Sequence, residues 1–228
     1  MLLSLVRGDP AFSMFRPIHE WSWHARGGVP VTEPWEAIEF TRVEGDAAEF
    51  IAADCLTMNT GADGFLISEF ARNVLSPRLD RAGEFWPVSV LGQPYWWLNC
   101  MASVEALDRV HTDADWSIVD GAWGSFSWIS TTRRLAFRPT QVENAPMLFR
   151  IPEYPQGVLF AREELRAIVE EAGLVGFRFD AVWSKEEGGI ADPPGVGFGG
   201  VFDQNSAKEV EFKRSKAREI LARRSQTV

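Results

Sequence analysis

The chain contains one pattern twice, as GFLISEFARNVLSPRLDRAGEFWPVSV (residues 64–90) and as GVLFAREELRAIVEEAGLVGFRFDAVW (residues 157–183). In each stretch a glycine precedes a short apolar run, and a second glycine 19 residues later precedes another. Each run has the length and composition of a strand, and the residues between the runs show helical spacing of apolar side chains. The two stretches therefore predict two similar strand–helix–strand units.

The second unit carries the clearer signals. A helix is expected over residues 162–172, because apolar side chains recur from Leu165 at the i, i+3, i+4 and i+7 positions of one face. Gly173 fits the C-terminal end of that helix. Residues 177–183 alternate apolar and polar side chains, which is typical of a half-buried strand.

In the first unit, Ser68 is expected to cap a helix that begins at Glu69, with Pro77 at or near its end. The apolar face of this helix is expected to include Phe70, Val74 and Leu75. The helical faces of the two units align less well than their strands do. The sequence therefore leaves open whether the units arose by duplication and whether they share one sheet.

An antiparallel hairpin is expected next along the chain. Residues 85–90 form its first strand, a turn follows at 92–94, and YWWLNCM (95–101) forms its second strand. Trp96 and Trp97 are consecutive, so they point to opposite faces of that strand. One of them is expected in the core, and the other needs a second layer, a partner or a ligand.

The remaining segments give weaker signals. Prolines and glycines predict an irregular segment over residues 1–50, apart from a strand at 36–43. The other expected elements are a helix or strand at 47–58, a short helix at 103–110, strands joined by turns at 111–146, a strand at 147–151, a loop at 184–200 and a helix at 206–224 with a Ser206–Glu209 capping box. We therefore expect an α+β fold in a single domain over 1–228, with a mixed sheet or two adjoining small sheets.

Composition and charge narrow the functional classes. The net charge of −9 divides into +4 over residues 208–228 and −13 over the rest. An acidic body repels phosphate backbones and argues against nucleic acid as the partner, but it favours encounter with a basic protein. The two cysteines, Cys55 and Cys100, have apolar flanks and are expected to be buried free thiols of a cytoplasmic protein. The chain shows no apolar run that predicts a membrane span or a secretory signal.

No motif of known chemistry is complete. GVGFGG (195–200) lacks the Lys-Ser/Thr of a phosphate loop, and His19 and His24 lack the spacing of metal ligands on one helical face. HTDAD (111–115) lacks the Gly and Glu of a calcium loop, and its acidic residues are better explained as a turn. We therefore expect no catalytic residue, no cofactor and no metal.

The repeated stretches carry a family resemblance. FLISEF, EFWPVSV, YWWLN and MLFRIPEYPQGVLFAREELRAIVEEAGLVGFRF occur in that order, and together they resemble the Imm-eleven family of bacterial immunity proteins over about residues 60–183. The chain departs from the family pattern at LFAREEL, where a "VSE"-like sequence is usual, and at Pro77. The resemblance implies a protein that binds and blocks a cognate toxin in the cytoplasm, without enzymatic activity.

The partner surface is expected outside the repeated units, in irregular segments where loops carry function. An acidic patch beside exposed tryptophan would steer a basic toxin toward this surface. The aromatic surplus of ten Trp and sixteen Phe also leaves an alternative, a small-molecule or carbohydrate binder with a groove lined by Trp96 or Trp97. The residues expected to contact the toxin are Asp113, Asp115, Trp116, Glu186, Glu187 and Asp192.

Overall fold

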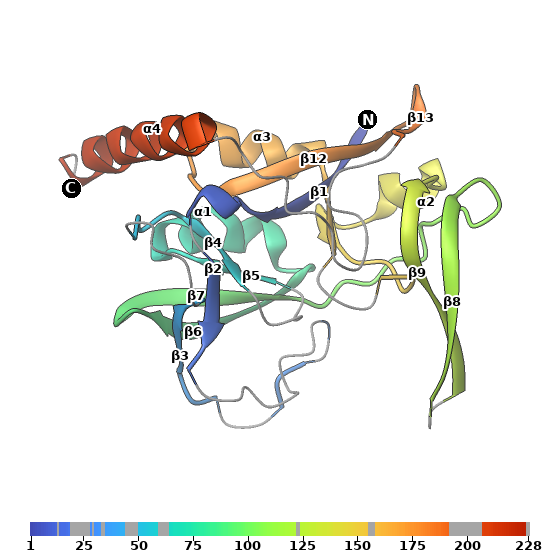
Figure 1. Cartoon of the computed structure of the whole chain (residues 1–228), viewed down its shortest axis with the longest axis horizontal. Helices are drawn as coiled ribbons and strands as arrows, with labels where there is room; N and C mark the ends of the chain where they lie inside the picture. Colours follow the sequence, from blue (N-terminus) through green and yellow to red (C-terminus); the bar gives the residue numbers. More distant parts are fainter. Residues whose placement is uncertain are drawn as a thin grey trace.

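The computed structural model describes residues 1–12, 14–18, 28, 30–32, 35–43, 50–58, 64–121, 124–154, 158–191 and 207–226. Over these residues the chain forms a five-stranded sheet, a closed barrel and a two-stranded hairpin, with four α-helices (Figure 1). The fold is α+β, as the sequence predicts. The described helices include none that is both long and apolar enough to cross a membrane.

The five-stranded sheet is antiparallel and has a strand from the chain's start at its centre. Its order is β10 (Leu148–Phe149), β11 (Leu159–Arg162), β1 (Leu2–Gly8), β12 (Phe177–Ser184) and β13 (Gly188–Gly189). The expectation of an irregular segment is wrong for residues 2–8. These residues pair with β11 on one side and β12 on the other, and they bury Leu3 and Val6.

The barrel closes on itself in the order β2 (Met14–Pro17), β3 (Ile38–Arg42), β6 (Gly83–Val90), β7 (Gln93–Cys100), β5 (Gly64–Ile67) and β4 (Cys55–Met58). The predicted hairpin of β6 and β7 is confirmed. Its two turn residues, Leu91 and Gly92, have φ values of 50° and 75°. Positive φ at both central positions matches the twist of a tight hairpin, so the turn lies at 91–92 and overlaps the expected 92–94 only at Gly92.

Both strand–helix–strand units are present, and they lie in different sheets. The first consists of β5, α1 (Glu69–Leu79) and β6, and the second of β11, α3 (Glu163–Glu171) and β12. In each unit the two strands run parallel to one another with a third strand between them, β7 in the barrel and β1 in the five-stranded sheet. The units are therefore alike in topology as well as in sequence pattern.

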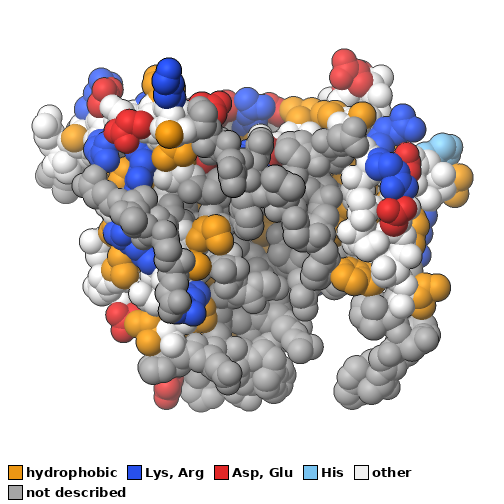
Figure 2. All heavy atoms as spheres, in the orientation of Figure 1, with side chains coloured by type: hydrophobic (Ala, Val, Ile, Leu, Met, Phe, Trp, Pro, Cys, Tyr) orange, Lys and Arg blue, Asp and Glu red, His pale blue; other side chains and the backbone are white. Residues whose placement is uncertain are grey.

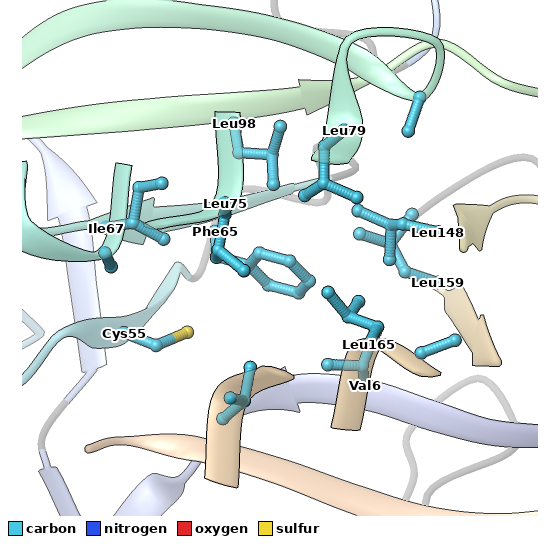
Figure 3. Packing of buried hydrophobic residues seen from close by; sticks show 14 of the residues in the cluster. Val6, Cys55, Phe65, Ile67, Leu75, Leu79, Leu98, Leu148, Leu159 and Leu165 are labelled. Atoms are coloured by element: carbon cyan, nitrogen blue, oxygen red, sulfur yellow. The ribbon is translucent and has the colours of Figure 1, made fainter. Parts of the chain in front are cut away.

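One apolar cluster joins the two units (Figure 3). Ala71, Leu75 and Leu79 of α1 contribute to it from the barrel side, and Leu165 and Val169 of α3 from the sheet side. Because the buried positions of α1 follow this face, the predicted face is right at Leu75 and wrong at Phe70, which is 40% exposed.

The ends of these helices match the sequence signals. Ser68 accepts a hydrogen bond from the backbone N of Ala71 and caps α1, as expected. Pro77 lies inside the last turn of α1, which continues to Leu79. Gly173 follows α3 with a φ of 62°, the left-handed conformation that glycine adopts most easily at a helix end.

The segment between the units forms a separate hairpin. It consists of β8 (Asp113–Gly121) and β9 (Gly124–Arg134), followed by α2 (Pro139–Asn144). The expectation of a helix at 103–110 is wrong. Isolated bridges hold this stretch instead, Ser103 with Arg150 and Leu107 with Phe137. Leu107 and Phe137 are also buried together in one apolar cluster.

The C-terminal helix α4 (Ala207–Ser225) packs along the barrel side of the molecule. Its Ala217 is fully buried, and Val210 and Leu221 pack against the cluster of buried barrel residues. Three of its basic residues also face the body: Lys213, Arg214 and Arg224. The expected cap Ser206 lies outside the described residues.

Candidate interaction surface

The β8–β9 hairpin projects from one side of the molecule, with β8 as its outermost strand (Figure 1). Ala114, Trp116 and Ile118 alternate on one face of β8. Ala114 and Trp116 pack against the cluster that contains the fully buried Ile129 of β9. Ile118 continues the same face but is 74% exposed. The apolar face of the hairpin therefore extends beyond the core that supports it.

A buried carboxylate anchors the base of the hairpin. Glu153 is 4% exposed, its Oε1 accepts a hydrogen bond from Nε of Arg109 at 3.0 Å, and the ion pair brings Nη2 of Arg109 to 3.0 Å from the same oxygen. Arg109 also lies over the ring of Trp116, with its Cζ 5.4 Å from the ring centroid. The backbone O of Glu153 accepts a hydrogen bond from the N of Ile129 at 3.1 Å. These contacts fix both strands of the hairpin relative to the body.

The two aspartates that the sequence selected share one arginine. Arg133 donates from Nε to Asp113 at 2.7 Å, and from both Nη atoms to Asp115 at 3.0 and 3.1 Å. Hydrogen bonds from Arg133 lower the pKa of the Asp115 carboxyl. The cluster therefore presents two carboxylates and one guanidinium at the surface, so its charge is less negative than the aspartates alone would give.

Figure 2 shows charged side chains of both signs close together over this side of the molecule, with hydrophobic side chains beside them. Asp113, Asp115 and Arg133 are each about half exposed. All three are therefore accessible to a partner in this arrangement, and Trp116 lies half-buried next to them in β8.

The second predicted segment reaches the base of the same hairpin. Ala191 forms a bridge with Arg134 at the end of β9, and β13 lies against the backbone of Leu135. In the turn before β13, Glu186 pairs with the terminal amine of Met1 at 3.1 Å, and the backbone N of Glu187 donates to Ser184 Oγ. The structure thus brings the two segments together through the backbone. Asp192 lies outside the described residues.

Three residues of this surface were missed by sequence reasoning. They are the cations and the carboxylate that organise it, Arg109, Arg133 and Glu153. Arg133 has no directly opposed residue in the register, because a bulge in β9 shifts the pairing there, so pairing 113–121 with 124–134 does not by itself place it beside the two aspartates. Glu153 follows a short strand in a turn sequence, which gives no sign of its burial.

The tryptophans proposed for a ligand groove are occupied by contacts within the protein. Trp97 is fully buried and stacks on Trp35, with ring centroids 5.8 Å apart. Trp96 donates to Glu69 at 2.5 Å and lies under the guanidinium of Arg72, whose Cζ is 3.7 Å from the ring centroid. As expected, the two side chains take opposite faces of β7. The fully buried Trp97 offers no surface to a carbohydrate.

The cysteines are buried free thiols, as predicted, and burial raises the pKa of the Cys55 thiol. A raised pKa disfavours the reactive thiolate. Among the residues that the structure describes, no cluster of three or more His, Cys, Asp or Glu side chains has the arrangement of a metal site.

Comparison with known proteins finds one family. Residues 38–184 match the family described as Immunity protein family (Imm11). The matched range contains both strand–helix–strand units and the whole β8–β9 hairpin. No curated protein matches the chain.

Proposed function

Because the chain belongs to the Immunity protein family (Imm11), we propose that it binds a cognate bacterial toxin in the cytoplasm and neutralises it by protein–protein contact rather than by catalysis. Family membership is the observation that carries this proposal. The architecture is consistent with it, since the repeated units form a framework and the segment between them forms a projecting hairpin.

The surface that we assign to the toxin is the β8–β9 hairpin and the adjoining β12–β13 turn. It combines a half-buried aromatic residue, Trp116, with the exposed apolar Ile118 and the Asp113–Arg133–Asp115 cluster. Interfaces that bind tightly have aromatic and arginine anchors surrounded by polar groups. We include in this proposed surface three acidic residues that follow β12 in the sequence, Glu186, Glu187 and Asp192.

The charge distribution favours a toxin with a basic surface. The body of the chain carries −13 outside the last 21 residues, and complementary charge raises the rate of protein association. Because Arg133 already compensates one of the two hairpin aspartates, we expect this attraction to come from the body as a whole. Association should therefore slow as the salt concentration rises.

The test is co-expression with an active-site variant and with the active form of the toxin encoded beside this gene. We expect rescue of growth by this protein and recovery of a stable complex by co-purification. Ile118→Arg should weaken the complex at least tenfold, because it places a charge on the exposed apolar part of the proposed surface. Phe212→Arg is the matched control, since Phe212 is 70% exposed on α4, away from the hairpin.

The outcomes separate the parts of this proposal. Rescue of growth without any complex would contradict neutralisation by binding. A complex that Ile118→Arg and Phe212→Arg leave equally strong would place the toxin on another surface.

A further inference from the structure

The hydrogen-bonding direction of β8 follows from its pairing with β9. Trp116 lies opposite Ile129 in the register, and the backbone N of Ile129 donates to Glu153 O, outside the hairpin. In an antiparallel pair, both opposed residues either bond to one another or point outward. The N–H and C=O of Trp116 therefore point to the outer edge of β8.

The neighbouring residues agree with this assignment. Asp115 O accepts a hydrogen bond from Ser130 Oγ, so the backbone of Asp115 faces β9. Alternation along β8 then directs the backbone groups of Ala114 and Ile118 outward, together with those of Trp116. Within residues 113–118, these outward groups have no backbone partner among the parts of the chain that the structure describes.

The outer edge of β9 differs from that of β8, because other segments cover it at two positions. Glu153 O takes the outward N–H of Ile129, and Ala191 bridges to Arg134. Elsewhere in the described fold, closure of the barrel removes its edges, and the five-stranded sheet ends in the two-residue strands β10 and β13. The nine-residue strand β8 is therefore the longest described edge that can accept another strand.

We propose that the outer edge of β8 pairs with an extended segment of the toxin, which extends the hairpin into a three-stranded sheet. This inference rests on the proposed function and specifies how the complex forms. Unpaired N–H and C=O groups in a row are a template for strand addition, in which main-chain hydrogen bonds supply affinity and alternate side chains supply specificity.

The side chains of β8 define the chemistry of that segment. Its first face carries the Asp113–Arg133–Asp115 cluster, which keeps one net negative charge and favours basic or polar residues directly opposite. Its second face carries Trp116 and Ile118, which favour apolar residues. The partner strand should therefore alternate basic or polar residues with apolar residues.

Hydrogen exchange measured by NMR on the full chain tests the pairing. The probe is an active-site variant of the toxin encoded beside the gene. In the free protein, the outward amides of Ala114, Trp116 and Ile118 should exchange faster than the inward amide of Asp115. In the complex, exchange of these outward amides should slow at least tenfold.

Two substitutions at one exposed position separate the backbone from the side chain. Ile118→Pro removes an outward N–H without breaking the β8–β9 ladder, and proline is tolerated at such edge positions. It should weaken toxin binding at least tenfold while the thermal unfolding transition remains. Ile118→Thr keeps the N–H and the preference for a strand. Its affinity for the toxin should therefore exceed that of Ile118→Pro at least tenfold.

Each outcome decides between the proposals. If a complex forms while the outward amides exchange as in the free protein, strand pairing is wrong and toxin binding stands. If no complex forms with the toxin, both proposals fail. If the same amides become protected in the free protein as its concentration rises, the occupant of the edge is a second copy of this chain, and pairing with the toxin is wrong.

Discussion

Arg224, on the last helix, donates two hydrogen bonds to the buried carboxylate of Asp54, at 2.8 and 3.0 Å. Asp54 is 1% exposed and also accepts hydrogen bonds from Ser68 Oγ and from the backbone N of Val175. One carboxylate thus joins α4, the cap of α1 and the segment before β12. Lys213 makes a second such contact with the buried Asp9, at 2.7 Å. The basic character of the C-terminal segment therefore serves docking of α4 on acidic groups of the body.

Removing Arg224 should destabilise the protein. In Arg224→Met, Asp54 keeps its bonds to Ser68 and Val175 but loses its only described cationic partner. Breaking one side of a buried ion pair costs about 3 kcal/mol. Urea unfolding followed by circular dichroism measures the change. Arg223→Met is the matched control, because the Arg223 side chain is 81% exposed, and an unchanged stability of Arg224→Met would contradict the docking role of this pair.

The second glycine of each repeated unit is required because a side chain would not fit at that position. A Cβ on Gly83 would lie 2.1 Å from Asn99 O, and a Cβ on Gly176 would lie 2.2 Å from Cys55 O. Both glycines therefore allow a neighbouring backbone to approach as the second strand of the unit begins. Gly176 also has a φ of 93°, which side chains rarely adopt.

Gly176→Ala should consequently cost about 3 kcal/mol or more, from strained backbone and displacement of the Cys55 carbonyl. Gly173→Ala should cost only about 1 kcal/mol, because Gly173 has a positive φ but no atom within 4 Å of the added Cβ. Thermal unfolding of the two variants compares a close approach with conformation alone. Equal losses would show that the Cys55 contact adds nothing.

The family-matched range should not fold alone. Residues 38–184 lack β1, which lies between β11 and β12 and pairs with both. They also lack β2, which closes the barrel between β3 and β4. We expect this fragment to show no cooperative urea transition, because each sheet loses a strand that no other described segment replaces. The full chain has both strands and keeps α4 paired with the buried Asp54, so it should unfold cooperatively. A cooperative transition in fragment 38–184 would contradict this dependence on the first residues.

Local signals allowed much of the fold to be predicted. The Ser68 cap, the Gly173 helix end and the β6–β7 hairpin each depend on residues within a few positions of one another. The central place of β1 could not be predicted in the same way. Its run LLSLVRG has no local signal for its partners, which lie more than 150 residues further along the chain.

The candidate surface was predictable in position but not in its internal pairing. The sequence predicts Asp113 and Asp115 as acidic contacts for a toxin but not that both pair with Arg133. Bulges in β9 shift the register around this arginine, between Asp113 and Ala114 and between Asp115 and Trp116. A one-residue change in register redirects side chains, so the composition of the segment does not determine which charges meet.

The pairing of Asp115 with Arg133 predicts a pH dependence. Because Arg133 lowers the carboxyl pKa of folded Asp115, the pairing contributes stability above the ordinary aspartate pKa of about 3.9. That contribution is lost as the pH falls through the lower pKa of the folded protein. NMR titration of the carboxyl should show this low pKa in the native protein, and Arg133→Gln should raise it toward the ordinary value.

Arg134→Gln is the matched control for this titration, because Arg134 follows Arg133 in β9 and its backbone bridges to Ala191. It should leave the pKa of Asp115 low, since the hydrogen bonds to that carboxylate come from Arg133. High salt should also raise the pKa, because the pair is exposed and screening weakens its attraction. An Asp115 pKa that Arg133→Gln leaves unchanged would show that the pair does not persist in solution, and the aspartates would then face a toxin with their full charge.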